Sequence, residues 1–289
     1  MFETADSLIK YCKENNCTIA DAVINSTIED NQTTREEIFN ELYKIIEVME
    51  NSAIYYTENK SKTELGMIDG FAYEMMKYAK GETITGTFLN EAMAMAFSTL
   101  EMSANMFKIV AAPTAGASGI LPAGLVSFTK RFNLNREQQA MALLTAVGMG
   151  EFISRYANFS GAEGGCQAEC GSAAAMTAGA LVYLMGGSVE QSLHAGSLAL
   201  LHVLGLICDP IAGLVEYPCT FRNASGIVNA MISADMALAG VKSIVPYEEV
   251  VKTMDKVGKE IPAVSRETGL GGIAASDTGC RIRQDFLGR

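Results

Sequence analysis

The chain has 289 residues, enough for one large domain or two modest ones. Its formal net charge of −11 at pH 7 argues against a nucleic-acid partner or an anionic membrane, because both require a basic surface. It contains seven cysteines, and its first residues do not resemble a secretory leader, so we expect a cytoplasmic protein with reduced thiols.

The first hundred residues are typical of charged amphipathic helices. Thr34 and Glu37 have the spacing of a capping box at the start of the segment 34–50, whose apolar residues form one helical stripe. The segment 90–107 has a second, less polar helical pattern. We expect residues 1–105 to form an amphipathic helical region that packs on a catalytic core of residues 106–289, in one continuous domain.

After Ile109 the sequence becomes rich in Gly, Ala and Pro, which predicts a loop leading into a helix. Asn135 is a candidate cap for the next helix, and the apolar segment 188–207 predicts a central helix that Pro210 ends. A further helix begins near Pro246. No alternating strand pattern is visible, so the predicted fold class is all-α, with functional loops between buried helices.

One uncharged run, residues 170–189, is long enough to imitate a membrane span. It lacks aromatic or basic residues at its ends, where membrane helices carry interfacial anchors. We therefore interpret it as a buried core helix and expect no membrane association.

The cysteines fall into two groups. Cys12 and Cys17 lie in the charged N-terminal region, follow no metal spacing, and are interpreted as structural. The spacing of the others does not match compact zinc or ferredoxin pairs, and cysteine is often simply buried. Their settings are nevertheless loop-like or at helix edges, which suits ligands. These five are Cys166, Cys170, Cys208, Cys219 and Cys280.

The chain has only two histidines, His194 and His202, and both lie in an apolar helical run. A metal site made of histidine and carboxylate would therefore be poorly supplied. Thiolate ligands favour zinc, copper(I) or an iron–sulfur cluster. The residues alone leave these three open, beside simple packing.

Four motifs, in order along residues 111–280, resemble the iron–sulfur-dependent L-serine dehydratases, and specifically the catalytic alpha chain of the two-chain form. They are APTAGASGILPAG, SGAEGGCQAECGSAAAMTAGA, CDPIAGLVEYPC with the following RNA, and RETGLGGIAASDTGC. The resemblance implies a [4Fe–4S] cluster held by Cys166, Cys208 and Cys219, with one iron lacking a protein thiolate. It also implies that Cys280 reaches that iron when substrate is absent, although nine residues follow Cys280 here. Cys170 is not implied as a ligand and is interpreted as packing.

The implied reaction is the elimination of water from L-serine, giving pyruvate and ammonia. The open iron would act as a Lewis acid on the serine hydroxyl while a base removes the Cα proton. Pyridoxal phosphate is not expected, because the surroundings of Lys130 lack a convincing pocket motif.

Residues 114–119 are the predicted substrate-binding loop. Small residues can turn backbone N–H groups inward as a nest for a carboxylate, although the same pattern also suits a tight turn between helices. Arg222 and Arg266 are further candidates for anion contact, beside a role in structural ion pairs. The predicted substrate-binding residues are Thr114, Gly116, Ala117, Ser118, Gly119 and Arg266.

The catalytic base is not identified from the sequence. We interpret His194 and His202 as core residues, and Glu163 and Glu169 as supporting or capping residues. In the two-chain family a smaller beta chain pairs with the alpha chain, so we expect a heterodimer in which that chain supplies part of the acid–base machinery.

Other functions remain open at this point. A cluster-dependent lyase could act on another β-substituted amino acid, as an L-cysteine desulfidase or a threonine dehydratase, because pocket size cannot be judged from sequence. From a different class, the chain could be a non-catalytic helical or membrane protein whose cysteines merely pack.

Overall fold

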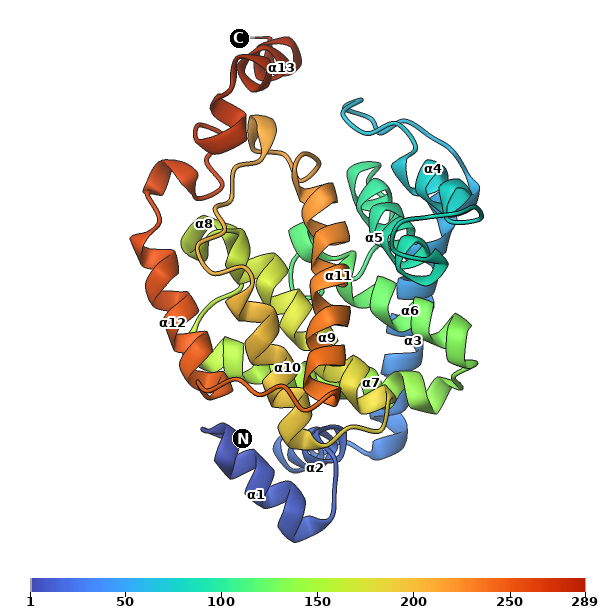
Figure 1. Ribbon diagram of the computed structural model, residues 1–289, viewed down its shortest axis with the longest axis vertical. Coiled ribbons are helices and arrows are strands. Elements are labelled where there is room, and N and C mark those ends of the chain that lie inside the picture. The colour runs from blue at the N-terminus through green and yellow to red at the C-terminus, as the bar shows by residue number, and fades with distance from the viewer. Residues whose placement is uncertain (1, 289) are drawn as a thin grey trace.

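The computed structural model describes residues 2–288, and the predicted all-α fold is confirmed (Figure 1). Five short turns, of which η2 is π-helical and the others are 3₁₀, separate the longer helices: η1 (Ala115–Ala117), η2 (Gln167–Gly171), η3 (Ile211–Gly213), η4 (Ala263–Ser265) and η5 (Gly272–Ala275). The α-helices in the described part of the chain are α1 (Ala5–Asn15), α2 (Ile19–Asn31), α3 (Arg35–Glu58), α4 (Phe71–Tyr78), α5 (Thr87–Ala104), α6 (Ile120–Phe132), α7 (Arg136–Tyr156), α8 (Gly161–Gly164), α9 (Ser172–Leu184), α10 (Val189–Leu201), α11 (Cys219–Leu238), α12 (Tyr247–Glu260) and α13 (Asp277–Leu287).

Helix α9 lies at the centre of the molecule, packed against α6, α7, α10 and α11 (Figure 1). Every residue from Ser172 to Val182 is buried. Small residues permit this close packing: a Cβ added at Gly179 would lie 2.7 Å from Met149 Cγ of α7. The prediction of a buried core helix is confirmed, and within residues 2–288 no helix is both long and apolar enough to cross a bilayer.

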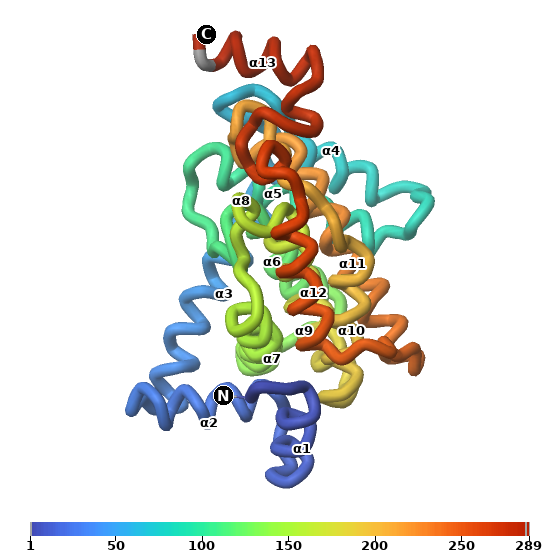
Figure 2. Tube along the Cα trace, turned by 90° about the vertical axis from the view of Figure 1, so that its left-hand side faces the viewer, coloured from blue at the N-terminus to red at the C-terminus, as the bar shows by residue number. Residues whose placement is uncertain are grey.

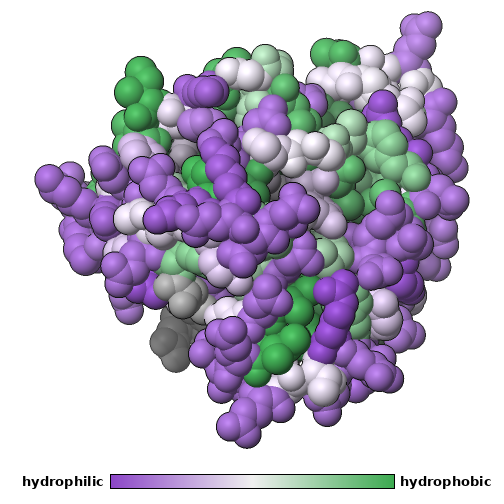
Figure 3. Space-filling model, turned by 90° about the horizontal axis from the view of Figure 1, so that it is seen from below, coloured by the Kyte–Doolittle hydropathy of each residue, from purple (hydrophilic) through white to green (hydrophobic). Residues whose placement is uncertain are grey.

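The two ends of the molecule are built from the two ends of the chain. Figures 1 and 2 agree in placing α1 and α2 at one end and α13 at the other. Seen from the α1–α2 end, the surface is mostly hydrophilic, with limited apolar areas between the charged side chains (Figure 3). The main core nevertheless takes residues from both parts of the sequence, joining Ile46 and Met49 of α3 to Ile120, Leu181 and Ile227.

The predicted helix starts agree with the structure. Thr34 caps α3 in a capping box with Glu37, and Asn135 caps α7 in another. The predicted end of the central apolar helix is wrong, because α10 stops at Leu201 rather than continuing to Pro210. Gly205, at φ +86°, turns the chain, and its N–H donates to Gln167 Oε1 at 2.8 Å instead of to a helical carbonyl.

Helix α4 receives its N-terminal cap from another helix. Its own cap residue, Gly70, has no side chain to offer, and the N–H of Ala72 donates instead to Glu101 Oε1 of α5 at 2.8 Å. The other carboxyl oxygen of Glu101 is buried without a hydrogen-bond partner in the described part of the chain. Burial raises the pKa of Glu101 to about 7, above its ordinary 4.5.

This carboxyl should make stability depend on pH. Because its pKa is higher in the folded chain, the folded state binds more protons between about pH 4.5 and 7, and the unfolding free energy falls as pH rises through that window. Glu101→Gln cannot ionise, so we expect it to flatten the decline by up to about 3 kcal/mol. Urea unfolding at pH 5 and pH 8 measures this, with Glu47→Gln on the exposed face of α3 as the control. If the unfolding free energy fell by the same amount between pH 5 and pH 8 in Glu101→Gln and in the parent, the raised pKa of Glu101 would be contradicted.

Candidate active site

Four buried thiols gather where η2, the loop after α10 and the start of α11 meet. Cys166 directly precedes η2, Cys208 lies in the loop, and Cys219 is the first residue of α11. The fourth, Cys170, lies on η2 itself, and its Sγ is 3.4 Å from Cys166 Sγ. None of the four is more than 3% exposed. The turn at 166–170, the loop at 208 and the start of α11 at 219 therefore bring four thiols to one place.

The thiols differ in their electrostatic surroundings. Burial, and then the charge of Cys166, raises the pKa of Cys208 and of Cys219. A hydrogen bond with Cys170 and the nearby guanidinium of Arg222 lower the pKa of Cys166, against the effect of its own burial. Metal-binding cysteines act as thiolates, which positive neighbours stabilise. Cys166 is thus the thiol of this group that its neighbours favour most as a thiolate.

An ion pair fixes the loop that carries Cys208. Arg222 Nη2 of α11 donates to Asp209 Oδ1, and Asp209 Oδ2 accepts a 2.7 Å hydrogen bond from the N–H of Ile273 in η5. Gly272 has φ +55°, and a Cβ added there would collide with the Asp209 carboxylate, so the close approach requires glycine. The pair ties the loop to both α11 and η5.

Two arginines lie at the edge of this cluster. Arg222 Nη1 is buried and has no hydrogen-bond partner among residues 2–288. Arg266 Nη1 donates to the carbonyl of Glu163 at 3.2 Å, which ties it to α8. The backbone on either side of Arg266 pairs with Cys208, whose N–H donates to Ser265 at 2.9 Å. The backbone of Ser265 and Glu267 therefore holds Cys208 in place, while Arg222 Nη1 and Arg266 Nε are both buried without a hydrogen-bond partner in the described part of the chain.

Glu169 is a buried carboxyl on η2 among the thiols. Its Oε1 accepts a hydrogen bond from Thr114 Oγ1 at 2.8 Å, and its Oε2 lies 3.8 Å from Cys208 Sγ. Gly161 and Gly116 leave room beside it, since a Cβ added at either would lie within 3.0 Å of its carboxyl oxygens. Burial raises the pKa of Glu169. Of the two roles expected for Glu169, support of the thiols and capping of a helix, its position agrees with the first, because the carboxyl faces Cys208.

The predicted substrate loop, residues 114–119, forms η1 and packs against η2 and α11. Several of its groups already have partners inside the protein. The N–H groups of Ala117, Ser118 and Gly119 donate to Thr114 O, Ala115 O and Asn223 Oδ1, and the Ser118 hydroxyl donates to Ala115 O. The loop lies at the thiols as predicted, but these three amides do not form an open nest.

Asn223 and Gln167 are functional-site residues to which the sequence analysis gave no role. Asn223 Nδ2 donates to Gly116 O at 2.7 Å and to Cys219 O at 2.9 Å, joining the 114–119 loop to α11. Gln167 Nε2 donates to the carbonyls of Gly164 and Met254, both at 2.9 Å. Both side chains are fully buried. The only signals available in the sequence were the place of Gln167 directly after Cys166 and the place of Asn223 four residues after Cys219.

Gly164 and Gly165 need no side chain for a reason that the sequence did not reveal. Next to a cysteine that binds a cluster, two such glycines are expected to let the backbone approach that cluster closely. Instead, a Cβ at Gly165, where φ is +76°, would lie 2.7 Å from Leu206 O and from Ile261 Cδ1. A Cβ at Gly258 of α12 would lie 2.7 Å from Gly164 Cα. Gly164 and Gly165 therefore allow α12 and the loop after α10 to pack against the backbone. The glycine that lies beside Cys208 is Gly161.

The two histidines and Cys280 lie apart from the thiols. His202 is exposed and hydrogen-bonds Asn229 Oδ1 at 2.6 Å, and half-buried His194 has a pKa lowered by burial and then by Lys242, so neither is the buried core residue we expected. Cys280 lies half-buried on α13, with its Sγ 3.9 Å from Ala274 O. It makes no contact with Cys166, Cys208 or Cys219 in the described structure.

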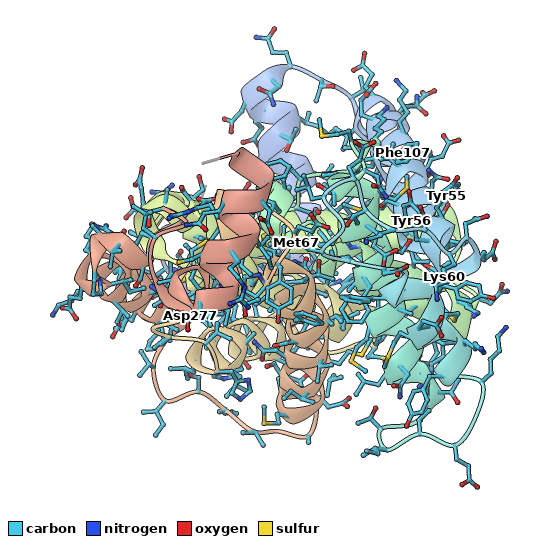
Figure 4. The ribbon with its side chains drawn as sticks, turned by 90° about the horizontal axis from the view of Figure 1, so that it is seen from above. Tyr55, Tyr56, Lys60, Met67, Phe107 and Asp277 are labelled. Atoms are coloured by element: carbon cyan, nitrogen blue, oxygen red, sulfur yellow. The ribbon has the colours of Figure 1, made fainter. Side chains whose placement is uncertain are left out.

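A cavity of about 850 Å³ opens between α13 and the loop that precedes α4. Figure 4 views this end, with Met67 of the loop and Asp277 at the start of α13 labelled. The cavity also borders η3, Tyr217 and η5, the segments that lie beside Cys208 and Cys219. Its apolar lining includes Leu65, Met67, Ile211, Tyr217, Ile273 and Phe286.

The family of serine dehydratase alpha chains matches residues 14–274. The chain belongs to that family. The L-serine dehydratase, alpha chain, of Peptoniphilus asaccharolyticus is 56% identical over 99% of both chains, and the probable L-serine dehydratase, alpha chain, of Bacillus subtilis (strain 168) is 41% identical over all of this chain and 96% of its own length. L-serine dehydratase 2 of Escherichia coli (strain K12) is 33% identical over 96% of this chain but only 62% of its own length. The resemblance seen in the motifs is confirmed at the level of the serine dehydratase alpha chain family.

Proposed function

We propose that this chain is the catalytic alpha chain of a cytoplasmic L-serine dehydratase, a lyase that eliminates water from L-serine without pyridoxal phosphate. The product would yield pyruvate and ammonia. The observation that carries this proposal is the convergence of Cys166, Cys208 and Cys219 in one buried place, within a family of serine dehydratase alpha chains.

The surroundings of the three thiols fit an iron–sulfur cluster. The donor set is thiolate-rich, a positive guanidinium lies beside it, and Gly161 leaves space where a Cβ would lie 2.8 Å from Cys208 Sγ. No group of three His, Cys, Asp or Glu side chains in residues 2–288 has the geometry to hold a single metal ion. Cys166, Cys208 and Cys219 would hold a [4Fe–4S] cluster, which supplies Lewis acidity at the substrate hydroxyl when bound.

We retain Cys280 as the fourth thiolate in the absence of substrate. Since it does not contact the other three, this role requires α13 to move toward them. α13 packs on η3 and η5, and these two turns lie next to the loop that carries Cys208. A shift of α13 would therefore act on segments that border the thiols.

Substrate binding belongs, in this proposal, to donors that the fold leaves available. Of the predicted set, Thr114 donates a hydrogen bond to Glu169, and Gly116 packs against the Glu169 carboxyl, which lies beside the thiols. The backbone amides of Ala117, Ser118 and Gly119 already have acceptors inside the protein. Arg222 Nη1 and Arg266 Nε are both buried without a hydrogen-bond partner among residues 2–288, and we favour Arg222 as the carboxylate contact because its guanidinium lies beside Cys166. A carboxylate bound there would have its charge neutralised by the guanidinium.

We propose Glu169 as the group in this chain that takes the Cα proton. It is the carboxyl that touches both the substrate loop, through Thr114, and the cluster ligand Cys208. A general base must lie within hydrogen-bond reach of the proton it removes, and this position meets that requirement for a substrate bound at the thiols. A beta chain would complete the enclosure and form a heterodimer; the longer relatives, of which this chain spans 62%, contain further sequence beyond its counterpart.

Anaerobic purification of the chain with its beta chain tests the proposal. We expect a brown protein with iron and sulfide in equal amounts that releases pyruvate from L-serine. Sulfide from L-cysteine or 2-oxobutanoate from L-threonine, at higher kcat/KM than pyruvate from serine, would identify the alternative lyases. A colourless protein without iron would contradict the proposed function and favour packing cysteines.

A further inference from the structure

Cys170 follows Cys166 by one turn, so both side chains lie on the same face of η2. The two sulfur atoms are 3.4 Å apart, and the Gly116 carbonyl oxygen lies 4.0 Å from Cys170 Sγ. A disulfide bond would bring the sulfurs to about 2.05 Å, so this pair is a non-bonded contact. Cys170 is only 3% exposed, and the sulfur of Cys166 is the nearer of these two polar atoms.

This contact argues against Cys170 as another ligand of the same cluster. A [4Fe–4S] cluster takes one thiolate at each iron, and thiolates at different corners point away from one another. Sulfur atoms in van der Waals contact do not meet that condition. Two adjacent thiolates in a buried site would also repel each other strongly. Cys170 is therefore placed as a hydrogen-bonding neighbour of Cys166 and not as a second ligand of the cluster.

Which of the two sulfurs donates follows from the proposed ligand set, in which Cys166 binds the cluster. A ligating Cys166 has no proton to donate, so the S–H of Cys170 is the donor between them. Its two acceptors are the charged sulfur at 3.4 Å and the neutral Gly116 carbonyl at 4.0 Å, and the charged, nearer acceptor makes the stronger hydrogen bond.

We propose that Cys170 is a positioning residue that donates an S–H···S hydrogen bond to the cluster-binding sulfur of Cys166. This rests on the proposed function, because it assumes that Cys166 binds the cluster. Hydrogen bonds to cluster sulfurs stabilise the more reduced, more negative state and raise the reduction potential. Partners of this kind also hold a ligand in its orientation. Without the bond, the cluster should be easier to oxidise.

The test compares Cys170→Ser, which keeps a donor, with Cys170→Ala, which does not. Both side chains are no larger than cysteine and should fit. We expect both variants to contain as much iron and sulfide as the parent, with a lower reduction potential and several-fold faster bleaching in air for the alanine variant alone. Cys12→Ala, which removes a buried thiol far from the cluster, should match the parent in every measurement.

A second measurement probes the S–H proton directly. Loading the parent chain in D₂O should shift the Fe–S(Cys) stretching band in the resonance Raman spectrum, and the same exchange should leave the alanine variant unchanged. Potentials that are equal in the parent, serine and alanine chains, or loss of the cluster from both variants, would overturn the role of Cys170. A parent chain without iron would instead contradict the proposed function itself.

Discussion

Replacing any one of Cys166, Cys208 and Cys219 with serine is expected to abolish both cluster retention and activity. Each of the three thiols comes from a different segment, and the further thiol beside them, Cys170, is proposed as a hydrogen-bond donor and not as a ligand. Serine is close to isosteric with cysteine, and the buried packing should survive. Iron and sulfide content after anaerobic purification, together with pyruvate release from L-serine, measures the effect.

Two other cysteines serve as controls for this experiment. Cys12→Ser lies on α1 at the far end of the molecule and should keep full cluster content and activity. Cys280→Ser should keep the cluster but make it more sensitive to oxygen, since it removes the proposed fourth thiolate. Full activity in any of the three ligand variants would remove the basis of the ligand assignment.

Glu169→Gln is expected to lower kcat by about 10²–10⁴-fold while the cluster stays bound, as is typical for loss of a general base. The amide keeps the shape of the carboxyl and can still accept the hydrogen bond from Thr114 Oγ1. It cannot take a proton from Cα. KM should change much less than kcat, because the substitution removes proton transfer and leaves the binding groups in place.

Glu163→Gln is the matched control for this substitution. Glu163 also lies three residues from Cys166, but its side chain is exposed and accepts a hydrogen bond from Asn158. Its activity should equal that of the parent. If Glu169→Gln were as active as Glu163→Gln, the base would have to come from elsewhere, and the beta chain would be the first place to search.

The helical fold and the candidate thiols could be predicted from sequence because both depend on local signals. Capping boxes at Thr34 and Asn135 mark helix starts, and the motif cysteines stand out in loop-like surroundings. The early end of α10 at Leu201 was not predicted, and beyond it the N–H of Gly205 donates to Gln167, 38 residues earlier in the chain. An apolar helical pattern contains no information on such a distant acceptor.

The roles of single side chains in the site were the hardest to predict. Glu169 and Glu163 look alike beside Cys166 in the sequence, yet one faces the buried thiols and the other faces solvent. Asn223 joins two segments that are more than a hundred residues apart. Such roles follow from how helices pack, which is a property of the whole chain rather than of any motif.

The contact between Gly258 and Gly164 makes α12 part of the site's architecture, although α12 carries none of the proposed ligands. Backbone meets backbone there, two residues before Cys166, so even one added methyl group would displace either α12 or the turn that delivers the thiol. A substitution at Gly258 of α12 would therefore be expected to inactivate the proposed enzyme, although α12 carries none of the proposed ligands or the proposed base. Screens for inactive variants should include such remote glycines among the positions least tolerant of change.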